Sequence, residues 1–214
     1  LIYILNEMLK HNGKELAGKT VLVSGSGNVA IYATEKVQQL GAKVVAMSDS
    51  NGYVVDENGI DFRIIQQIKE QKRERISTYP NYVPTAKYVE GCAGIWSVPC
   101  DIAMPCATQN DVNMDSAKKI AASGIKYYIE VANMPTTNDA LEFLKEQKHM
   151  VIAPSKAVNA CGVAVSALEM AQNAERLYWT AEEVDAKMHQ IMANIYHSSV
   201  AAAERYGLGY DLVA

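Results

Sequence analysis

The sequence has no apolar run long enough to cross a membrane. An α-helix needs roughly 20 consecutive apolar residues to span a bilayer, and no segment of the 214 residues approaches this length. The first residues also lack the basic stretch and apolar core of a secretory signal peptide. We therefore expect a cytoplasmic protein that does not act in a membrane.

Charge and cysteine usage exclude two further classes of protein. The formal net charge is −4 at pH 7, and no long run of Lys and Arg occurs, which argues against nucleic acid as the main partner. The four cysteines form no C-x-x-C pair, and the four histidines lack H-E-x-x-H or comparable spacing. Reduced, mostly buried thiols are therefore expected rather than a metal site. With 49% hydrophobic and 21% charged residues, the chain has the composition of a globular protein with a sizeable core.

A glycine-rich turn near the N-terminus carries the clearest functional signal. An apolar strand at 19–24 leads into residues 25–30, which read Gly-Ser-Gly-Asn-Val-Ala. Gly25 permits a tight turn, Gly27 lets the backbone approach a pyrophosphate, and the small Ala30 lets the following helix lie close to the strand. An acidic residue, Asp49, follows a second strand about 20 positions later, as the fingerprint requires. The pattern predicts a dinucleotide site at the N-terminus of this helix.

Hydrophobic periodicity predicts strands that alternate with helices. Strands are expected at 19–24, 43–47, 101–104, 126–131 and 150–153, with a possible short strand at 87–89 and an excursion at 53–59. Helices are expected at the N-terminus and at 28–40, 60–68, 115–123, 137–147 and 163–176, and a capping box of Thr180 and Glu183 begins a long helix that ends at 205. This alternation predicts an α/β fold, a Rossmann-like, doubly wound, mostly parallel sheet with helices on both faces and further helices at the C-terminus.

Polar side chains recur directly after the predicted strands. The carboxyl ends of parallel strands meet at one edge of a sheet, where ligands bind. The residues at this edge are Ser48, Asp49, Thr108, Gln109, Asn110, Asn133, Thr136, Thr137 and Asn159. Each alone can be an ordinary loop former or helix cap, but their convergence favours a shared ligand. Amides both donate and accept hydrogen bonds, as recognition of a nicotinamide carboxamide requires.

Taken together, these stretches resemble the nucleotide-binding domain of the small, hexameric glutamate dehydrogenases, within the Glu/Leu/Phe/Val dehydrogenase superfamily. The resemblance covers essentially the whole chain and is most specific at residues 25–30, 105–110, 132–137 and 159–173. It implies reversible oxidation of L-glutamate to 2-oxoglutarate and ammonium, with hydride transfer to or from NAD(P). It also implies a homohexamer for the complete enzyme.

The resemblance further implies roles for individual residues. The pyrophosphate is expected at Gly25, Ser26, Gly27, Asn28 and Val29, and the adenosine ribose at Ser48 and Asp49. The ribose and nicotinamide side is expected at Ala107, Thr108, Gln109, Asn133 and Asn159. Val163 and Ser166 would face the substrate, where the Ser166 hydroxyl can hydrogen-bond the glutamate side-chain carboxylate. The alternative for Ser166 is a bond to a backbone carbonyl one helical turn earlier.

No catalytic residue is assigned within the chain. The resemblance implies that a catalytic lysine and a proton-shuttling aspartate come from an N-terminal substrate domain, which nothing in this sequence matches. We therefore expect residues 1–214 to be one NAD(P)-binding domain excised from a larger two-domain enzyme, with the helices of residues 163–205 facing the substrate domain. Such a domain can orient the cofactor but lacks the groups that manage protons, so we expect binding without turnover.

The signals for the cofactor conflict. Asp49 alone favours NAD, because an acidic residue at this position accepts hydrogen bonds from the ribose 2′-hydroxyl and repels a 2′-phosphate. Ser48 can donate to a phosphate, and Lys69, Lys72 and Arg75 are spaced three apart on one face of the predicted helix. These cations could bind a phosphate or form a solvated face balanced by neighbouring glutamates. The resemblance to the NADP-using members favours NADP, with NAD as the alternative.

Two other functions fit parts of the pattern. An enzyme acting on a branched-chain or aromatic amino acid would favour an apolar residue where Ser166 stands. A free-standing module that senses NAD(P) would need a partner-binding surface or an effector segment, and the sequence displays neither. Glutamate dehydrogenase chemistry is therefore the leading hypothesis.

Overall fold

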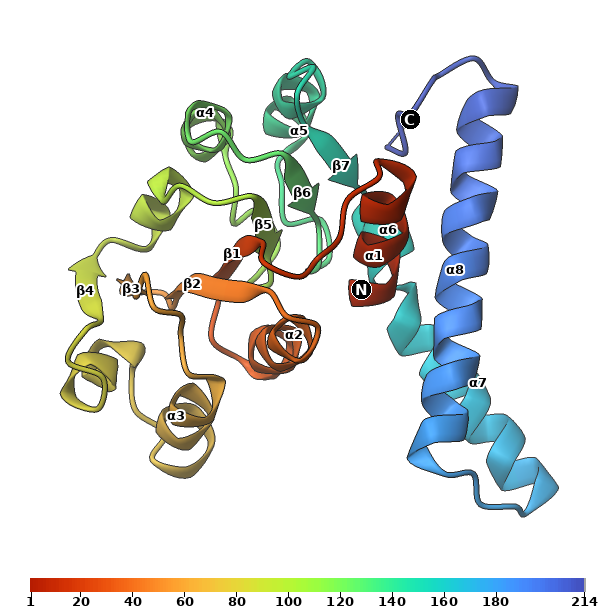
Figure 1. The fold of residues 1–214 in the computed structure, drawn as a ribbon, viewed down its shortest axis with the longest axis horizontal. Helices are drawn as coiled ribbons and strands as arrows, with labels where there is room; N and C mark the ends of the chain where they lie inside the picture. The colour runs from red at the N-terminus through yellow and green to blue at the C-terminus, as the bar shows by residue number, and fades with distance from the viewer. Residues whose placement is uncertain (214) are drawn as a thin grey trace.

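A computed structural model describes residues 1–213 and places a seven-stranded sheet at their centre (Figure 1). The strands are β1 (Thr20–Ser24), β2 (Lys43–Ser48), β3 (Gly52–Val55), β4 (Lys87–Glu90), β5 (Ile102–Pro105), β6 (Tyr127–Ile129) and β7 (Val151–Ala153). They lie in the order β4-β3-β2-β1-β5-β6-β7. Pairs among β2, β1, β5, β6 and β7 are parallel, and β3 and β4 add an antiparallel edge. The predicted mostly parallel sheet is confirmed.

Helices cover both faces of this sheet, as predicted. They are α1 (Ile2–His11), α2 (Asn28–Gln39), α3 (Phe62–Gln66), α4 (Met114–Ala122), α5 (Asn138–Lys145), α6 (Ser155–Val158), α7 (Ala160–Glu175) and α8 (Ala181–Arg205). Helices α1, α2, α3 and α8 contribute to one hydrophobic core, and α4 and α5 contribute to a second core on the opposite face (Figure 1).

The central strand β1 divides its side chains between these two cores. Val21 and Val23 are buried on the side of α1 and α2, whereas Leu22 is buried on the side of α4 and α5. Successive side chains of a strand point to opposite faces of the sheet, so an unbroken apolar run is what a strand covered on both faces requires. Each such side chain contributes about 1.5–3 kcal/mol of burial free energy. This burial fixes the strand whose end carries the glycine-rich turn.

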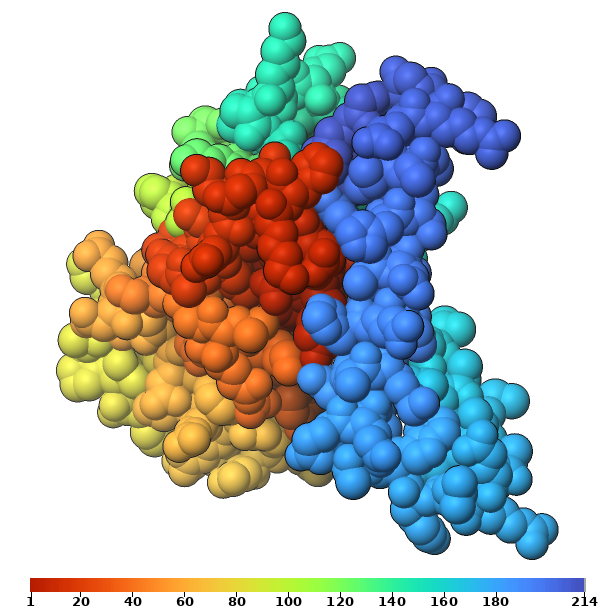
Figure 2. All heavy atoms as spheres, turned by 45° about the vertical axis from the view of Figure 1, so that its right-hand side comes forward, coloured from red at the N-terminus to blue at the C-terminus, as the bar shows by residue number. Residues whose placement is uncertain are grey.

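The long helix α8 begins at the predicted capping box and packs along α1 (Figure 2). The Thr180 hydroxyl accepts from the Glu183 N–H at 3.2 Å, and the Glu183 carboxylate accepts from the Thr180 N–H at 2.7 Å. Met188 and Met192 are buried in the α1 core, whereas none of the residues of α7 is buried. Among residues 1–213, no helix combines the length and apolarity that crossing a membrane requires.

The basic segment after β3 differs from the prediction. Helix α3 passes into a π-helical turn (Gln67–Gln71), and Arg73 then adopts a left-handed conformation with φ of 54°. Arg75 is already extended, with φ of −83° and ψ of 154°. The prediction that Lys69, Lys72 and Arg75 share one helix face is therefore wrong, because Arg75 lies beyond the helix. Glycine is the residue that usually marks a left-handed turn, and its absence here left no signal in the sequence.

Two smaller differences concern short elements. Residues 52–55 form β3, which pairs with β2 as an antiparallel neighbour instead of leaving the sheet. The helix expected at 163–176 begins at Ala160 and follows the four-residue helix α6 directly. A helix of this length is too short to display a periodic pattern.

Candidate functional site

A groove of about 660 Å³ runs along the carboxyl ends of β1, β2 and β5. The predicted cofactor residues that line it are Gly25, Ser26, Gly27, Asn28, Val29, Ser48, Asp49, Lys69, Arg75, Ala107 and Thr108. Ser50, Cys92, Cys106 and Asp111 also line the groove and were not predicted as site residues. Ser50 and Asp111 directly follow Asp49 and Asn110, which lie at predicted strand ends, whereas Cys92 follows a turn without any functional signal in the sequence.

The two glycines of the turn have different surroundings. Gly25 has φ of +88°, and a Cβ built on it would lie 3.0 Å from the Cα of Ala107. Only glycine fits this turn without strain, because the loop after β5 approaches it closely. A Cβ on Gly27 would meet no atom within 4 Å. A side chain there would project into the open groove, which is the space that a phosphate needs.

The first backbone N–H groups of α2 border the same space. Gly27 is the N-cap of α2, and no side chain of the described residues caps this end. The first N–H groups of a helix have no partner within the helix and favour an anion. The exposed Asn28 and Val29 begin this helix and line the groove. The turn therefore offers backbone donors, an open approach and the positive end of the helix dipole at one point.

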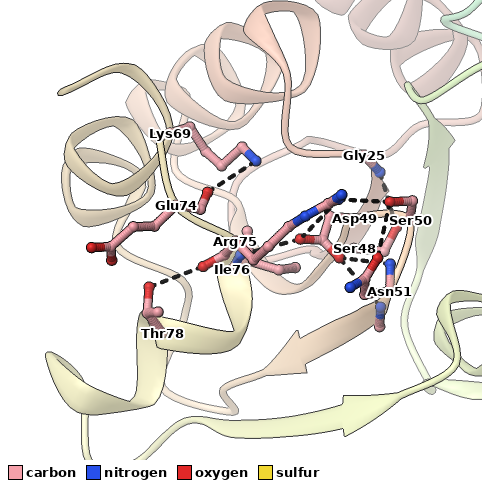
Figure 3. Close-up of polar contacts among 11 residues, drawn as sticks. Gly25, Ser48, Asp49, Ser50, Asn51, Lys69, Glu74, Arg75, Ile76 and Thr78 are labelled. Atoms are coloured by element: carbon pink, nitrogen blue, oxygen red, sulfur yellow. Dashed lines mark hydrogen bonds and ion pairs between the residues drawn. The ribbon is translucent and has the colours of Figure 1, made fainter. Parts of the chain in front are cut away.

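A hydrogen bond between two strand ends fixes the position of the turn. The buried Ser48 hydroxyl at the end of β2 accepts from the Gly25 N–H at 2.9 Å (Figure 3). The Ser48 side chain thereby acts on the turn itself. Its hydroxyl proton remains available for a further acceptor, because a serine hydroxyl both donates and accepts.

The Asp49 carboxylate is turned into its own loop (Figure 3). One oxygen accepts from the N–H groups of Asn51 at 2.9 Å and Gly52 at 3.3 Å, and the other accepts from Ile76 N–H at 3.2 Å. The side chain is only 5% exposed, and Arg75 Nη1 lies 3.9 Å from its second oxygen. A carboxylate has about four lone-pair sites. Three backbone donors occupy sites on this one, and Arg75 at 3.9 Å forms a long ion pair without a hydrogen bond.

Two cations, Arg75 and Lys69, line the groove, and Arg75 lies beside this carboxylate. Arg75 Nη1 donates to the Ser50 hydroxyl at 2.6 Å, and the Arg75 side chain is 54% exposed. Lys69 Nζ donates to the backbone carbonyl of Glu74 at 3.2 Å (Figure 3). Lys72, in contrast, donates to the Tyr82 hydroxyl and lies 4.7 Å from the centre of that ring. It does not line the groove, which separates it from the other two cations.

A second acidic side chain, Asp111, lies on the opposite wall of the groove. Its carboxylate accepts from the Ser24 hydroxyl at 2.6 Å, and this hydroxyl accepts from the Cys106 N–H at 3.2 Å. Burial raises the pKa of Asp111, and the hydrogen bond from Ser24 opposes that shift. Burial also raises the pKa of the Cys106 thiol, so this cysteine is not a nucleophile at neutral pH. The end of β1 and the loop after β5 are thus joined beneath the groove.

The remaining predicted cofactor residues lie at the next strand ends. Gln109 is exposed in the loop after β5, and neither it nor Asn133 and Asn159 lines the groove. The Asn159 amide donates to the Asn133 side-chain carbonyl at 2.5 Å. The loops after β6 and β7 therefore meet through these two amides.

The predicted substrate residues lie on α7. Val163 is 77% exposed, and Ser166 is exposed as well. The Ser166 hydroxyl donates to the Gly162 carbonyl at 3.2 Å, which is the alternative geometry considered above. Within residues 1–213, no group of three or more His, Cys, Asp and Glu side chains could hold a metal ion.

The whole chain, residues 1–214, matches the family described as Glutamate/Leucine/Phenylalanine/Valine dehydrogenase. The chain belongs to this family. The turn at 25–30 and the groove at the strand ends lie within the matched residues.

Individual relatives cover the chain almost completely. The NAD-specific glutamate dehydrogenase of Clostridium symbiosum is 50% identical over an alignment of 222 residues, gaps included, that covers 100% of this chain and 48% of that protein. The NADP-specific glutamate dehydrogenase of Escherichia coli is 48% identical over 202 residues, 94% of this chain and 45% of that protein. The crystal structure of Plasmodium falciparum glutamate dehydrogenase is 44% identical with a TM-score of 0.93, and the match covers 99% of this chain and 46% of that one. The chain thus spans about half the length of the curated relatives that it matches.

Proposed function

We propose that this chain is the coenzyme-binding domain of a glutamate dehydrogenase and that it binds NADP(H). The reaction is the reversible oxidation of L-glutamate to 2-oxoglutarate and ammonium. The single observation that carries the proposal is the turn at 25–30, where an uncapped helix N-terminus, an open glycine and a groove coincide. The names of the relatives supply the reaction.

The division of work among the residues follows from their positions. The backbone at Gly27, Asn28 and Val29 would hold the pyrophosphate, because these residues line the groove at the N-terminus of α2. Asn133 and Asn159 would hold the nicotinamide side, where paired amides can donate and accept. When bound, NADP supplies the hydride acceptor of the reaction. The residues of this chain bind and orient that cofactor.

The choice of NADP over NAD depends on the state of Asp49. An aspartate that selects NAD offers its carboxylate to the ribose 2′-hydroxyl. Here the carboxylate is buried, accepts three backbone N–H groups and faces Arg75. Three backbone N–H groups use most of its hydrogen-bonding capacity, and Arg75 partly balances its charge. Asp49 is therefore a weak obstacle to a 2′-phosphate.

The cations supply the attraction. Lys69 and Arg75 line the groove next to the Ser50 hydroxyl, and a 2′-phosphate carries between one and two negative charges near neutral pH. The ion pair of Arg75 with Asp49 is long and half-exposed, so it holds the guanidinium with about 1 kcal/mol or less. A phosphate can therefore recruit this guanidinium through charge-assisted hydrogen bonds. We do not assign Lys72 to the phosphate site, because it contacts Tyr82 and does not line the groove.

On the substrate side, we propose that Val163 and Ser166 face glutamate. Both are exposed on α7, and the Ser166 hydroxyl is engaged only with a carbonyl of its own helix. A hydroxyl with this partner can rotate to meet a ligand carboxylate, because the carbonyl retains its helical hydrogen bond. That the helices of 163–205 face a substrate domain, that the complete enzyme is a hexamer and that it is cytoplasmic remain predictions.

The test of the function uses the complete gene product that contains these residues. Reduction of NADP is followed with L-glutamate, L-leucine, L-phenylalanine and L-valine as alternative substrates. We expect glutamate to give the highest kcat/KM by at least about tenfold, because a buried or aligned hydrogen-bonding site discriminates strongly against substrates that lack the matching group. A higher value with leucine, phenylalanine or valine would refute glutamate as the substrate. If the complete protein binds NADP(H) tightly but oxidises none of the four amino acids, the result would instead support a sensing role.

A further inference from the structure

A buried carboxylate outside the groove links the strand ends on the nicotinamide side. Glu130 follows β6 directly and is 3% exposed. One of its oxygens accepts from the Thr136 hydroxyl at 2.6 Å, and the other accepts from the Ser155 N–H at 3.1 Å. The Tyr128 and Thr136 hydroxyls lie 2.7 Å apart and extend the network. Within the described residues, no Lys, Arg or His nitrogen lies within 4.0 Å of this carboxylate.

Burial of such a carboxylate is unfavourable in free energy. A carboxylate without a cation loses hydration that only hydrogen bonds replace. Burial raises the pKa of Glu130, and its bonds to Thr136 and Ser155 oppose the shift. An apolar residue at this position would avoid the unfavourable desolvation of a carboxylate. The presence of a glutamate therefore indicates that its hydrogen bonds have a role beyond filling space.

The two partners of Glu130 belong to different loops. Thr136 lies in the loop between β6 and α5, three residues after Asn133, and Ser155 is the first residue of α6, which ends just before Asn159. The carboxylate therefore joins the segment that carries one amide to the segment that carries the other. Further along, the two amides bond to each other.

The loop after β5 is attached to the same structure. The Val112 N–H donates to the Pro135 carbonyl at 2.9 Å, and the Thr137 N–H donates to the Val112 carbonyl at 3.0 Å. The segments after β5, β6 and β7 thus form one connected unit, and Glu130 is the side chain that crosses from β6 to α6.

We propose that Glu130 is a positioning residue, whose two carboxylate oxygens hold Asn133 and Asn159 at the spacing that the nicotinamide–ribose half of the cofactor requires. This inference rests on the proposed function, because it takes the groove edge at β6 and β7 as the site of that half. Glutamate suits the role because both oxygens accept. Glutamine keeps one acceptor oxygen and replaces the other with an NH₂ group. Both charge-assisted bonds then become neutral and weaker, and the Thr136 hydroxyl and the Ser155 N–H can no longer both donate to this side chain.

Two ligands separate positioning from general stability. NADPH occupies both halves of the site, whereas adenosine 2′,5′-bisphosphate carries only the adenosine and the 2′-phosphate. Kd values for both are measured by calorimetric titration of the 214-residue chain, alongside thermal unfolding. In Glu130→Gln we expect NADPH to bind about tenfold more weakly, as the loss of one well-placed amide contact implies. The Kd of adenosine 2′,5′-bisphosphate should change less than about twofold.

Matched variants keep the test decisive. Glu146→Gln makes the same chemical change on an exposed residue of the neighbouring helix end and should leave both Kd values unchanged. Thr136→Val removes the hydroxyl that donates to Glu130 and should repeat the pattern of Glu130→Gln. Thr136→Ser keeps the hydroxyl and should behave as the wild type.

Three results would overturn the inference. An unchanged NADPH Kd in both Glu130→Gln and Thr136→Val would show that the carboxylate does not position the amides. Equal weakening of both ligands would show that it stabilises the whole domain. Failure of the wild-type chain to bind either ligand would overturn the proposed function itself, and the inference with it.

Discussion

Asp49 and Glu130 occupy equivalent places at the two ends of the candidate site, yet their surroundings differ. Each is a buried carboxylate at or just after the end of a strand, and each fastens the loop that follows. Asp49 accepts three backbone N–H groups and has Arg75 beside it, whereas Glu130 accepts one N–H and one hydroxyl and has no cation within 4.0 Å among the described residues. In the proposed function, the first carboxylate leaves phosphate selection to Lys69 and Arg75. In the further inference, the second sets the spacing of Asn133 and Asn159.

The largest loss of cofactor binding is expected at Gly27, where the proposed pyrophosphate site adjoins the adenosine end. Gly27→Val should weaken NADPH binding by at least about 100-fold, because the side chain would fill the space over the N-terminus of α2 and remove charge-assisted bonds of about 1.5–3 kcal/mol each. The fold should survive, since a Cβ at Gly27 meets no atom within 4 Å. Calorimetric titration and thermal unfolding check the two statements. A retained NADPH Kd would place the pyrophosphate elsewhere.

Asp49→Asn asks whether this carboxylate is a structural group. An amide has one acceptor oxygen, so at least one of the N–H groups of Asn51, Gly52 and Ile76 would lose its partner. We expect the free energy of unfolding to fall by about 1–3 kcal/mol in urea titrations. Ser50→Ala, on the exposed neighbour, is the control and should change stability by less than about 0.5 kcal/mol. An unchanged stability in Asp49→Asn would mean that the carboxylate is free to read the ribose.

Arg75→Ala tests whether the Arg75 guanidinium, which forms only a long ion pair with Asp49, contributes to phosphate binding. Loss of one exposed guanidinium that reaches a phosphate should weaken NADPH binding by about tenfold, and NADH binding should change by less than about twofold. Lys72→Ala is the matched control, because Lys72 contacts Tyr82 and does not line the groove. Equal losses for NADPH and NADH in Arg75→Ala would contradict a role in phosphate selection.

The smallest expected effect is a pH dependence from Asp111 in the opposite wall. Burial raises the pKa of Asp111 in the folded chain above the value of about 3.9 for an unfolded aspartate. The stability that this group contributes is therefore fully present below about pH 4 and is lost as the pH rises through the raised pKa. Asp111→Asn cannot titrate. Its unfolding free energy should fall less than that of the wild type, or rise more, between about pH 4 and neutral pH. Parallel pH profiles for the two proteins would contradict this expectation.

Local patterns predicted most of the fold. Two apolar strands with a glycine turn between strand and helix identified β1, α2 and β2, and the Thr180 and Glu183 pair marked the start of α8. Each of these features depends on neighbouring residues and therefore leaves a pattern in the sequence. The short helix α6 has no period and was not predicted.

The details of the site depend on contacts between distant residues. The sequence contained Asp49 and Arg75 but did not reveal that Ile76 N–H would bind the carboxylate, because this contact joins residues 27 positions apart. The left-handed conformation of Arg73 turns the chain so that Arg75 reaches the groove. No glycine or proline in the sequence indicates this turn. The Glu130 contact to Ser155 is of the same kind, with 25 positions between them. The residue types of the site could therefore be predicted, whereas the hydrogen-bond partners of Asp49 and Glu130 could not.

The groove is proposed to select a dinucleotide with a 2′-phosphate although Asp49 lies at its edge. Titration of the wild-type chain with NADPH and NADH under identical buffer and salt tests it most directly. Lys69 and Arg75 together predict that NADPH binds at least about tenfold more tightly, and that the difference shrinks as salt is raised. Equal or tighter binding of NADH would contradict the account.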